Sequence, residues 1–190
     1  MTVLDNVMYG LKLKKIPKKE AREKSIKWLQ KVHLGKFINA YPHELSGGMK
    51  QRVAIARALV MDPEILLMDE PFAALDEQTR MVLHKELESL WKETGKTIIF
   101  VTHNIREAVV LSDRIILMKT RPGGIKNEFK VQAARPRSTP DSLLLHLESR
   151  ILEELEQEME KVLKEEFGSD YDYKKDSIYT DPRNNLGSDI

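Results

Sequence analysis

The sequence contains no cysteine, no long apolar run and almost no net charge. Without cysteine the chain has no disulfide and no thiol chemistry, which fits a cytosolic protein. No apolar stretch approaches the roughly 20 residues that cross a bilayer and no signal peptide is evident, so membrane attachment is expected only through partners. The net charge of +1, from 31 basic and 30 acidic residues, excludes the strongly basic footprint of many nucleic-acid-binding proteins.

Histidine is present, but not with the spacing of a metal site. The five histidines are His33, His43, His84, His103 and His146. None of them forms the short-range pairs that are typical of zinc ligands. Charged residues make up 32% of the chain and its mean hydropathy is −0.43, which indicates a water-soluble chain long enough to bury one core.

A glycine pair stands in "HELSGGMKQR", residues 43–52, directly before an apolar pattern with helical spacing. Glycine can adopt positive φ and allows a ligand to approach the backbone. The first turn of the following helix offers unpaired amides and the positive end of the helix dipole. The stretch therefore predicts an anion site, although an ordinary turn that only starts a helix is the open alternative.

Two acids follow a short apolar run in "EILLMDEP". Residues 65–68 suit a buried parallel strand whose carboxyl end opens on a site. An adjacent pair there can have two roles. Asp69 can hold Mg²⁺ through water, and Glu70 can polarise an attacking water. The alternative is a strand that simply ends in a solvated acidic turn.

A histidine ends the next β-rich run, "TIIFVTH", which follows a helical stretch at residues 76–95. If the two strands are parallel neighbours, His103 and Glu70 emerge at the same sheet edge. His103 can then contact a terminal phosphate or the attacking water. Its alternative role is to cap the helix predicted in "NIREAVVLSD".

Four motifs in register, "LSGGMKQR", "ILLMDEP", "AALD" and "VTH", resemble the signature motif, Walker B with its catalytic glutamate, D-loop and His-switch of an ABC transporter ATP-binding subunit. The resemblance runs from Met1 to about Arg137. The stretches "MTVLDNV", "PFAALDEQTR" and "LSDRIILMKTRPGGI" most resemble importer subunits of the nitrate, sulfonate and taurine type. The resemblance implies an α/β fold with a P-loop NTPase core of parallel strands plus a helical subdomain.

The resemblance also implies ATP as substrate, Mg²⁺ as cofactor and a place on the cytoplasmic side of the cell membrane, as a peripheral subunit. The expected partners are a second ATP-binding subunit, transmembrane permease subunits and, indirectly, a solute-binding protein. By the resemblance, Ser46, Gly47 and Gly48 bind the γ-phosphate of the ATP on the facing subunit. Asp69 holds Mg²⁺ and Glu70 polarises the attacking water. His103 contacts the phosphate and the water, and Asp76 lies at the dimer seam. Met49 and Asn104 depart from the glutamine and aspartate that are common at these places, and neither is given a role.

No Walker A motif, G-x-x-x-x-G-K-[ST], occurs in the sequence. Gly95-Lys96-Thr97 lacks the first glycine, because position 90 is leucine, and Gly95 is predicted to be a helix C-cap. The adenine-stacking aromatic and the Q-loop glutamine are also absent. We therefore expect the chain to correspond to the latter part of the module; whether Met1 is a true start stays open.

The function has alternatives. The retained Glu70 favours an ATP-hydrolysing importer subunit, whereas the missing Walker A favours a truncated, non-catalytic fragment or pseudo-subunit that completes a composite ATP site with an intact partner. A DNA-repair or translation ATPase of the same superfamily is disfavoured by the neutral charge and by the lack of a coiled-coil insertion or second cassette.

Four segments are predicted: a partial helical subdomain at 1–42, the signature helix and second half of the core at 43–137, a C-terminal helix at 138–168, and a disordered tail at 169–190. "RPRSTP" reads as a linker. The apolar stripe of the C-terminal helix favours packing on its own domain over pairing with a partner. The six lysines between Lys12 and Lys24 form either a solvated helix face or a contact with acidic lipid heads.

Overall fold

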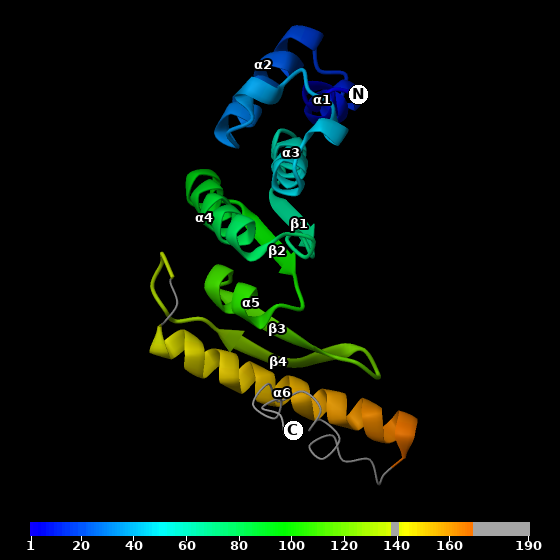
Figure 1. Ribbon diagram of the computed structural model, residues 1–190, viewed down its shortest axis with the longest axis vertical. Coiled ribbons are helices and arrows are strands. Elements are labelled where there is room, and N and C mark those ends of the chain that lie inside the picture. Colours follow the sequence, from blue (N-terminus) through cyan, green and yellow to red (C-terminus); the bar gives the residue numbers. More distant parts are fainter. Residues whose placement is uncertain (138–140, 169–190) are drawn as a thin grey trace, which may run out of the picture. The chain divides into compact units, whose positions relative to one another are not determined.

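The computed structural model describes residues 1–137 and 141–168 (Figure 1). The chain divides into two compact units, Met1–His103 and Asn104–Ile190, so that the predicted segment 43–137 runs across the division. The tail predicted at 169–190 lies outside the described residues. None of the described helices is long and apolar enough to cross a bilayer.

The first unit begins with helices, as predicted. α1 (Val3–Leu13) packs on both α2 (Lys18–Lys31) and α3 (Gly47–Leu59), and the short 3₁₀ turns η1 (Gly35–Phe37) and η2 (Pro42–Glu44) lie between α2 and α3. The apolar face of α1 is buried because its residues recur at helical spacing. Pro17 stands at the start of α2, where its fixed φ is favourable.

The sheet of this unit has two parallel strands. β1 (Ile65–Asp69) pairs with β2 (Thr97–Val101), with Leu67 opposite Ile99, and α4 (Glu77–Thr94) connects them. Gly95 ends α4 with φ 61°, which confirms the predicted C-cap. The chain thus forms the predicted βαβ unit.

The two faces of this sheet differ. On one face Phe72 is fully buried. The centroid of its ring lies 5.0 Å from that of His84 on α4 and 5.8 Å from that of Phe100 on β2. On the other face Leu67 is 72% exposed and Ile99 is 51% exposed. The prediction of a buried strand is therefore wrong for this face, whose side chains stay exposed in the described part of the chain.

The second unit is an antiparallel hairpin with two helices. α5 (Ile105–Leu111) precedes β3 (Arg114–Lys119) and β4 (Gly124–Lys130), whose register shifts between Leu117 and Met118, and α6 (Ser142–Phe167) follows. Its buried core consists of Val109, Phe129, Val131, Ala133, Leu144 and Ile151. The stripe of α6 thus packs on its own unit, as predicted for Leu144, Leu147 and Ile151.

α6 begins and ends at defined caps. Asp141 caps its start by accepting a hydrogen bond from the Leu143 amide at 2.8 Å. The start predicted at residue 138 lies outside the described residues. The helix stops at Gly168, as predicted.

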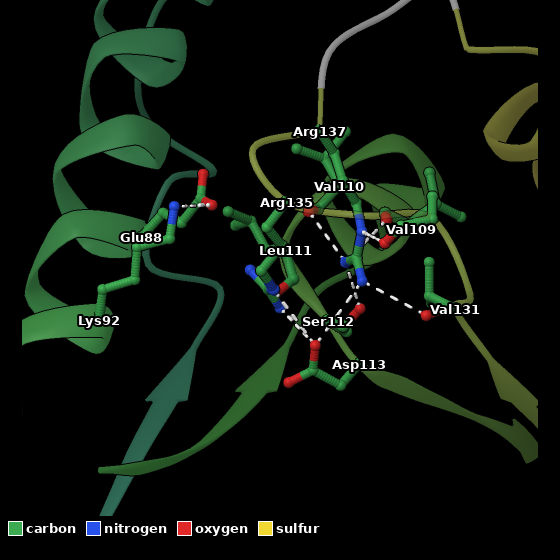
Figure 2. A network of polar contacts seen from close by, with 11 residues as sticks. Glu88, Lys92, Val109, Val110, Leu111, Ser112, Asp113, Val131, Arg135 and Arg137 are labelled. Atoms are coloured by element: carbon green, nitrogen blue, oxygen red, sulfur yellow. Dashed lines mark hydrogen bonds and ion pairs between the residues drawn. The ribbon is translucent and has the colours of Figure 1, made fainter. Parts of the chain in front are cut away.

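Arg137 shows that the predicted linker is part of the fold. Its side chain is only 2% exposed, and its guanidinium lies among backbone carbonyls of the α5 end and of the segment after β4 (Figure 2). The accepting oxygens are those of Val109, Val110, Ser112, Val131 and Ala133, at 2.6–3.5 Å. The neighbouring Arg135 pairs with Asp113 at 2.9 Å. The start of "RPRSTP" is thus anchored by charge-assisted hydrogen bonds.

Candidate functional site

Glu70 and His103 meet at one edge of the parallel sheet. Glu70 directly follows β1 and His103 comes two residues after β2, so both emerge at carboxyl ends of parallel strands. The His103 Nδ1 and Glu70 Oε2 atoms are 2.8 Å apart, which confirms the predicted proximity. The alternative capping role belongs to Asn104, whose side chain accepts from the Glu107 amide at 3.1 Å.

The backbone of Glu70 adopts an unusual conformation. Its φ is +43°, in the left-handed region that costs a residue with a side chain about 1–2 kcal/mol. The Glu70 amide donates to the Val101 carbonyl at 2.9 Å, which continues the strand ladder and holds this conformation. Such strain clusters at functional sites, and here it aims a carboxylate at the end of β2.

The glycine pair opens helix α3. Ser46 is the N-cap, and its Oγ accepts from the Met49 amide at 3.3 Å. Gly47 and Gly48 lie in the first turn of α3 and do not use the positive φ that glycine allows. Glycine at position 48 allows a close approach of α3 and α4, because a Cβ there would lie 2.7 Å from Thr79 Cγ2 on α4. The first-turn amides still provide the geometry of an anion site.

Asp76 caps the helix that follows β1. Its carboxylate accepts from the Thr79 amide at 2.9 Å and from the Thr79 hydroxyl at 2.7 Å. These hydrogen bonds hold the pKa of Asp76 below its ordinary value, because they favour the ionised form. The implied role of Asp76 at a dimer seam stays a prediction.

A hollow of about 490 Å³ joins the signature helix to the acidic pair. Gly47 and Lys50 of α3 line it together with Asp69, the last residue of β1, and Glu70, which follows it. Ser46, Gly48, Asp76 and His103 are not among the residues that line it. Lys50 was missed by the sequence reasoning, although it stands three residues after Gly47 and therefore on the same helix face. The hollow thus offers a cation and two carboxylates.

A metal ion would have few protein ligands here. The described residues contain no group of three or more histidine, aspartate or glutamate side chains that could hold one. Asp69 supplies a single carboxylate. Mg²⁺ is commonly held by one or two carboxylates with substrate phosphates and water, so Asp69 fits Mg²⁺ only together with a nucleotide.

Sequence comparisons give the same family as the motifs. Residues 1–73 match the sequence model of the ABC transporter family. The chain is 52% identical, over 163 residues, to an uncharacterized ABC transporter ATP-binding protein of Methanocaldococcus jannaschii, with 86% of this chain and 61% of that protein covered. It is 45% identical, over 134 residues, to a taurine import ATP-binding protein of Rhizobium johnstonii, with 70% of this chain and 51% of that protein covered.

A solved structure matches the fold. A dimeric bacterial ABC transporter cassette superposes with a TM-score of 0.59 at 38% sequence identity, over 70% of this chain and 58% of the cassette. The chain thus spans about half to three fifths of the length of the relatives it matches. With the motifs in register and this fold, the chain resembles part of an ABC transporter ATP-binding domain, of the P-loop NTPase class, in both sequence and structure.

Proposed function

We propose that the chain serves as the ATP-binding and ATP-hydrolysing subunit of an importer that takes up a small solute such as nitrate, a sulfonate or taurine. The observation that carries the proposal is the 2.8 Å contact between His103 Nδ1 and Glu70 Oε2 beside Asp69. Relatives named as taurine, aliphatic sulfonate and nitrate import ATP-binding proteins support the solute class. We place it on the cytoplasmic side of the membrane, with permease subunits and a second ATP-binding subunit as partners.

The proposed chemistry is hydrolysis of the γ-phosphate of ATP by water. Glu70 accepts the proton of the attacking water, and His103 orients that carboxylate and contacts the phosphate. The α3 amides at Gly47 and Gly48, with Ser46, stabilise negative charge on the γ-phosphate of the facing subunit.

Asp69 would hold Mg²⁺ through water. When bound, Mg²⁺ neutralises charge on the phosphates. Asp76 keeps its cap on α4 and lies at the seam between subunits.

A second function is favoured by one observation. The sequence contains no G-x-x-x-x-G-K-[ST], so the described residues offer no loop for the β-phosphate. In this reading the chain lends Ser46, Gly47 and Gly48 to an ATP bound by an intact partner and performs no hydrolysis at its own acids. Both readings require Walker A to come from outside these 190 residues.

A mixed dimer with an intact homologous subunit tests the proposal. Ser46→Arg on this chain should abolish hydrolysis at the composite site, because the arginine fills the phosphate turn. Glu70→Gln on this chain should change little there. When a Walker A segment is fused ahead of Met1, Glu70→Gln should lower turnover by roughly a hundredfold or more, as for loss of a general base, and leave ATP binding intact.

The chain with the fused Walker A segment distinguishes the ATP-hydrolysing function from the non-catalytic function. A rate that is low and insensitive to Glu70→Gln would favour the non-catalytic function. Hydrolysis or tight Mg-ATP binding by the purified 190-residue chain alone would contradict both.

A further inference from the structure

The turn between α1 and α2 concentrates positive charge. We define the basic turn as residues 12–19, "KLKKIPKK", which contain five lysines and no acid. The five lysines are all exposed. This is a local excess in a chain whose total charge is only +1. The proposed ATP chemistry does not use it.

Most of this charge is not neutralised within the protein. Lys12 pairs with Asp5 at 3.0 Å, and Lys14 Nζ reaches only the Met61 carbonyl, at 3.5 Å. Lys15, Lys18 and Lys19 have no ion-pair partner in the part of the chain that the structure describes. Three free ammonium groups thus lie within five residues.

The basic turn is ordered. The Lys15 amide donates to the Lys12 carbonyl at 3.0 Å and the Ile16 amide donates to the Leu11 carbonyl at 3.1 Å. These two bonds form a Schellman motif, in which glycine is usual at the left-handed position. Lys15 holds that position with φ 56°. The backbone that carries the Lys15 side chain is thus held in one conformation.

Apolar side chains lie beside the charges. Leu13 ends α1 and is 68% exposed, and Tyr9, one turn earlier on the same helix face, is 51% exposed. Exposed Tyr and Leu beside free lysines are typical of surfaces that lie in the interface of a membrane. A solvated helix face needs no such pair.

We propose that the basic turn binds the surface of anionic lipid bilayers, with Lys15, Lys18 and Lys19 on the headgroups and Leu13 entering the interface. A bilayer fits better than a nucleic acid, because recognition of single strands favours aromatic stacking in a charged groove, whereas an exposed leucine gains most from lipid. The contact is independent of ATP and of the other subunits.

Sedimentation with vesicles tests the charges. The chain should bind vesicles rich in phosphatidylglycerol, and not vesicles of phosphatidylcholine alone. Substituting Lys15, Lys18 and Lys19 with glutamine should weaken binding on the order of a hundredfold, from roughly fivefold for each lysine. Salt of about 1 M, which shortens the Debye length to about 3 Å, should release the protein.

A matched triple variant distinguishes an effect of the basic turn from an effect of net charge alone. Substituting Lys27, Lys119 and Lys130 with glutamine removes the same charge from exposed positions elsewhere and should leave binding within a few fold. Equal loss in both triple variants, equal binding to neutral vesicles, or lysine-dependent binding to RNA or an acidic protein without vesicle binding would each overturn the proposal.

Single-cysteine labelling tests the orientation without altering the charges. Because the chain contains no cysteine, Leu13→Cys gives one attachment site for an environment-sensitive fluorophore. Its emission should shift to the blue on phosphatidylglycerol vesicles. A label at Leu67→Cys, on the open sheet face, should not respond. A response at position 67 and none at position 13 would assign vesicle binding to the open sheet face and refute the basic turn.

Discussion

Each of the two units contains a two-stranded sheet, and the two sheets differ in how fully their faces are covered. The hairpin of the second unit has a buried core against α5 and α6, and Arg137 holds the segment after β4. The parallel pair of the first unit is covered on one face and bare on the other, where Leu67 and Ile99 are exposed. Parallel strands are almost always covered on both faces. The unit that carries the candidate site is thus the one whose sheet is incomplete by itself.

Loss of Arg137 should produce the largest effect. Arg137→Met keeps much of the buried volume but leaves five backbone carbonyls without their donor, so we expect the second unit to lose about 3 kcal/mol or more. Hydrogen exchange should show lost protection in α5 and β4, with α1–α3 unchanged. Arg114→Gln, which removes an exposed pair with Glu128, is the control and should cost under about 1 kcal/mol. Unchanged protection in α5 would contradict the anchoring role.

The two faces of the β1–β2 sheet should respond differently to substitution. Met68→Ala on the covered face should cost about 2–4 kcal/mol, because it leaves a cavity. Leu67→Thr and Ile99→Thr together, on the open face, should change stability by less than about 1 kcal/mol and reduce self-association, because they shrink an exposed apolar surface. Denaturant unfolding and sedimentation velocity measure the two effects. A large stability loss from the open-face pair would show that this face is covered in solution.

The smallest effect concerns pH. The hydrogen bonds from Thr79 place the folded pKa of Asp76 below 3.8, so their contribution is present above pH 3.8 and is lost as the pH falls through the lower folded value. Asp76→Asn keeps an N-cap acceptor without this titration. The variant should match the parent at neutral pH and lose less stability under acid, measured by circular dichroism. Parallel acid profiles in the two proteins would contradict it.

Local patterns predicted much of the fold. The motifs that end β1 and β2 predicted a parallel pair and the proximity of Glu70 and His103, because the positions of strand ends follow from chain order in a βαβ unit. The Gly95 cap followed from a glycine at the end of a helical pattern, because glycine favours the left-handed C-cap position. Strand ends and helix caps follow from residues close in sequence, and the βαβ connection then brings the two strand ends together.

Other features depended on contacts between distant residues. The sequence predicts a linker at the buried Arg137, because an arginine between prolines has the pattern of a solvated segment unless the carbonyls around it are known. The bare face of β1 could not be predicted, because an apolar run reads as buried whether or not a covering element exists. Lys50 was missed because its place on the hollow requires β1 to lie opposite α3.

The close approach of Gly48 to Thr79 affects how the signature motif can be studied. A Cβ at position 48 would lie 2.7 Å from Thr79 Cγ2, so either the Thr79 side chain or the spacing between α3 and α4 has to change to accommodate it. A variant there that loses function cannot distinguish a lost phosphate contact from separated helices. Ser46 is exposed and its Oγ accepts a hydrogen bond from the Met49 amide, so a change there reports on the ligand once the loss of this cap is allowed for. Mutational scans of this motif should therefore treat a loss of function at Gly48 as a combined effect on packing and on the phosphate contact.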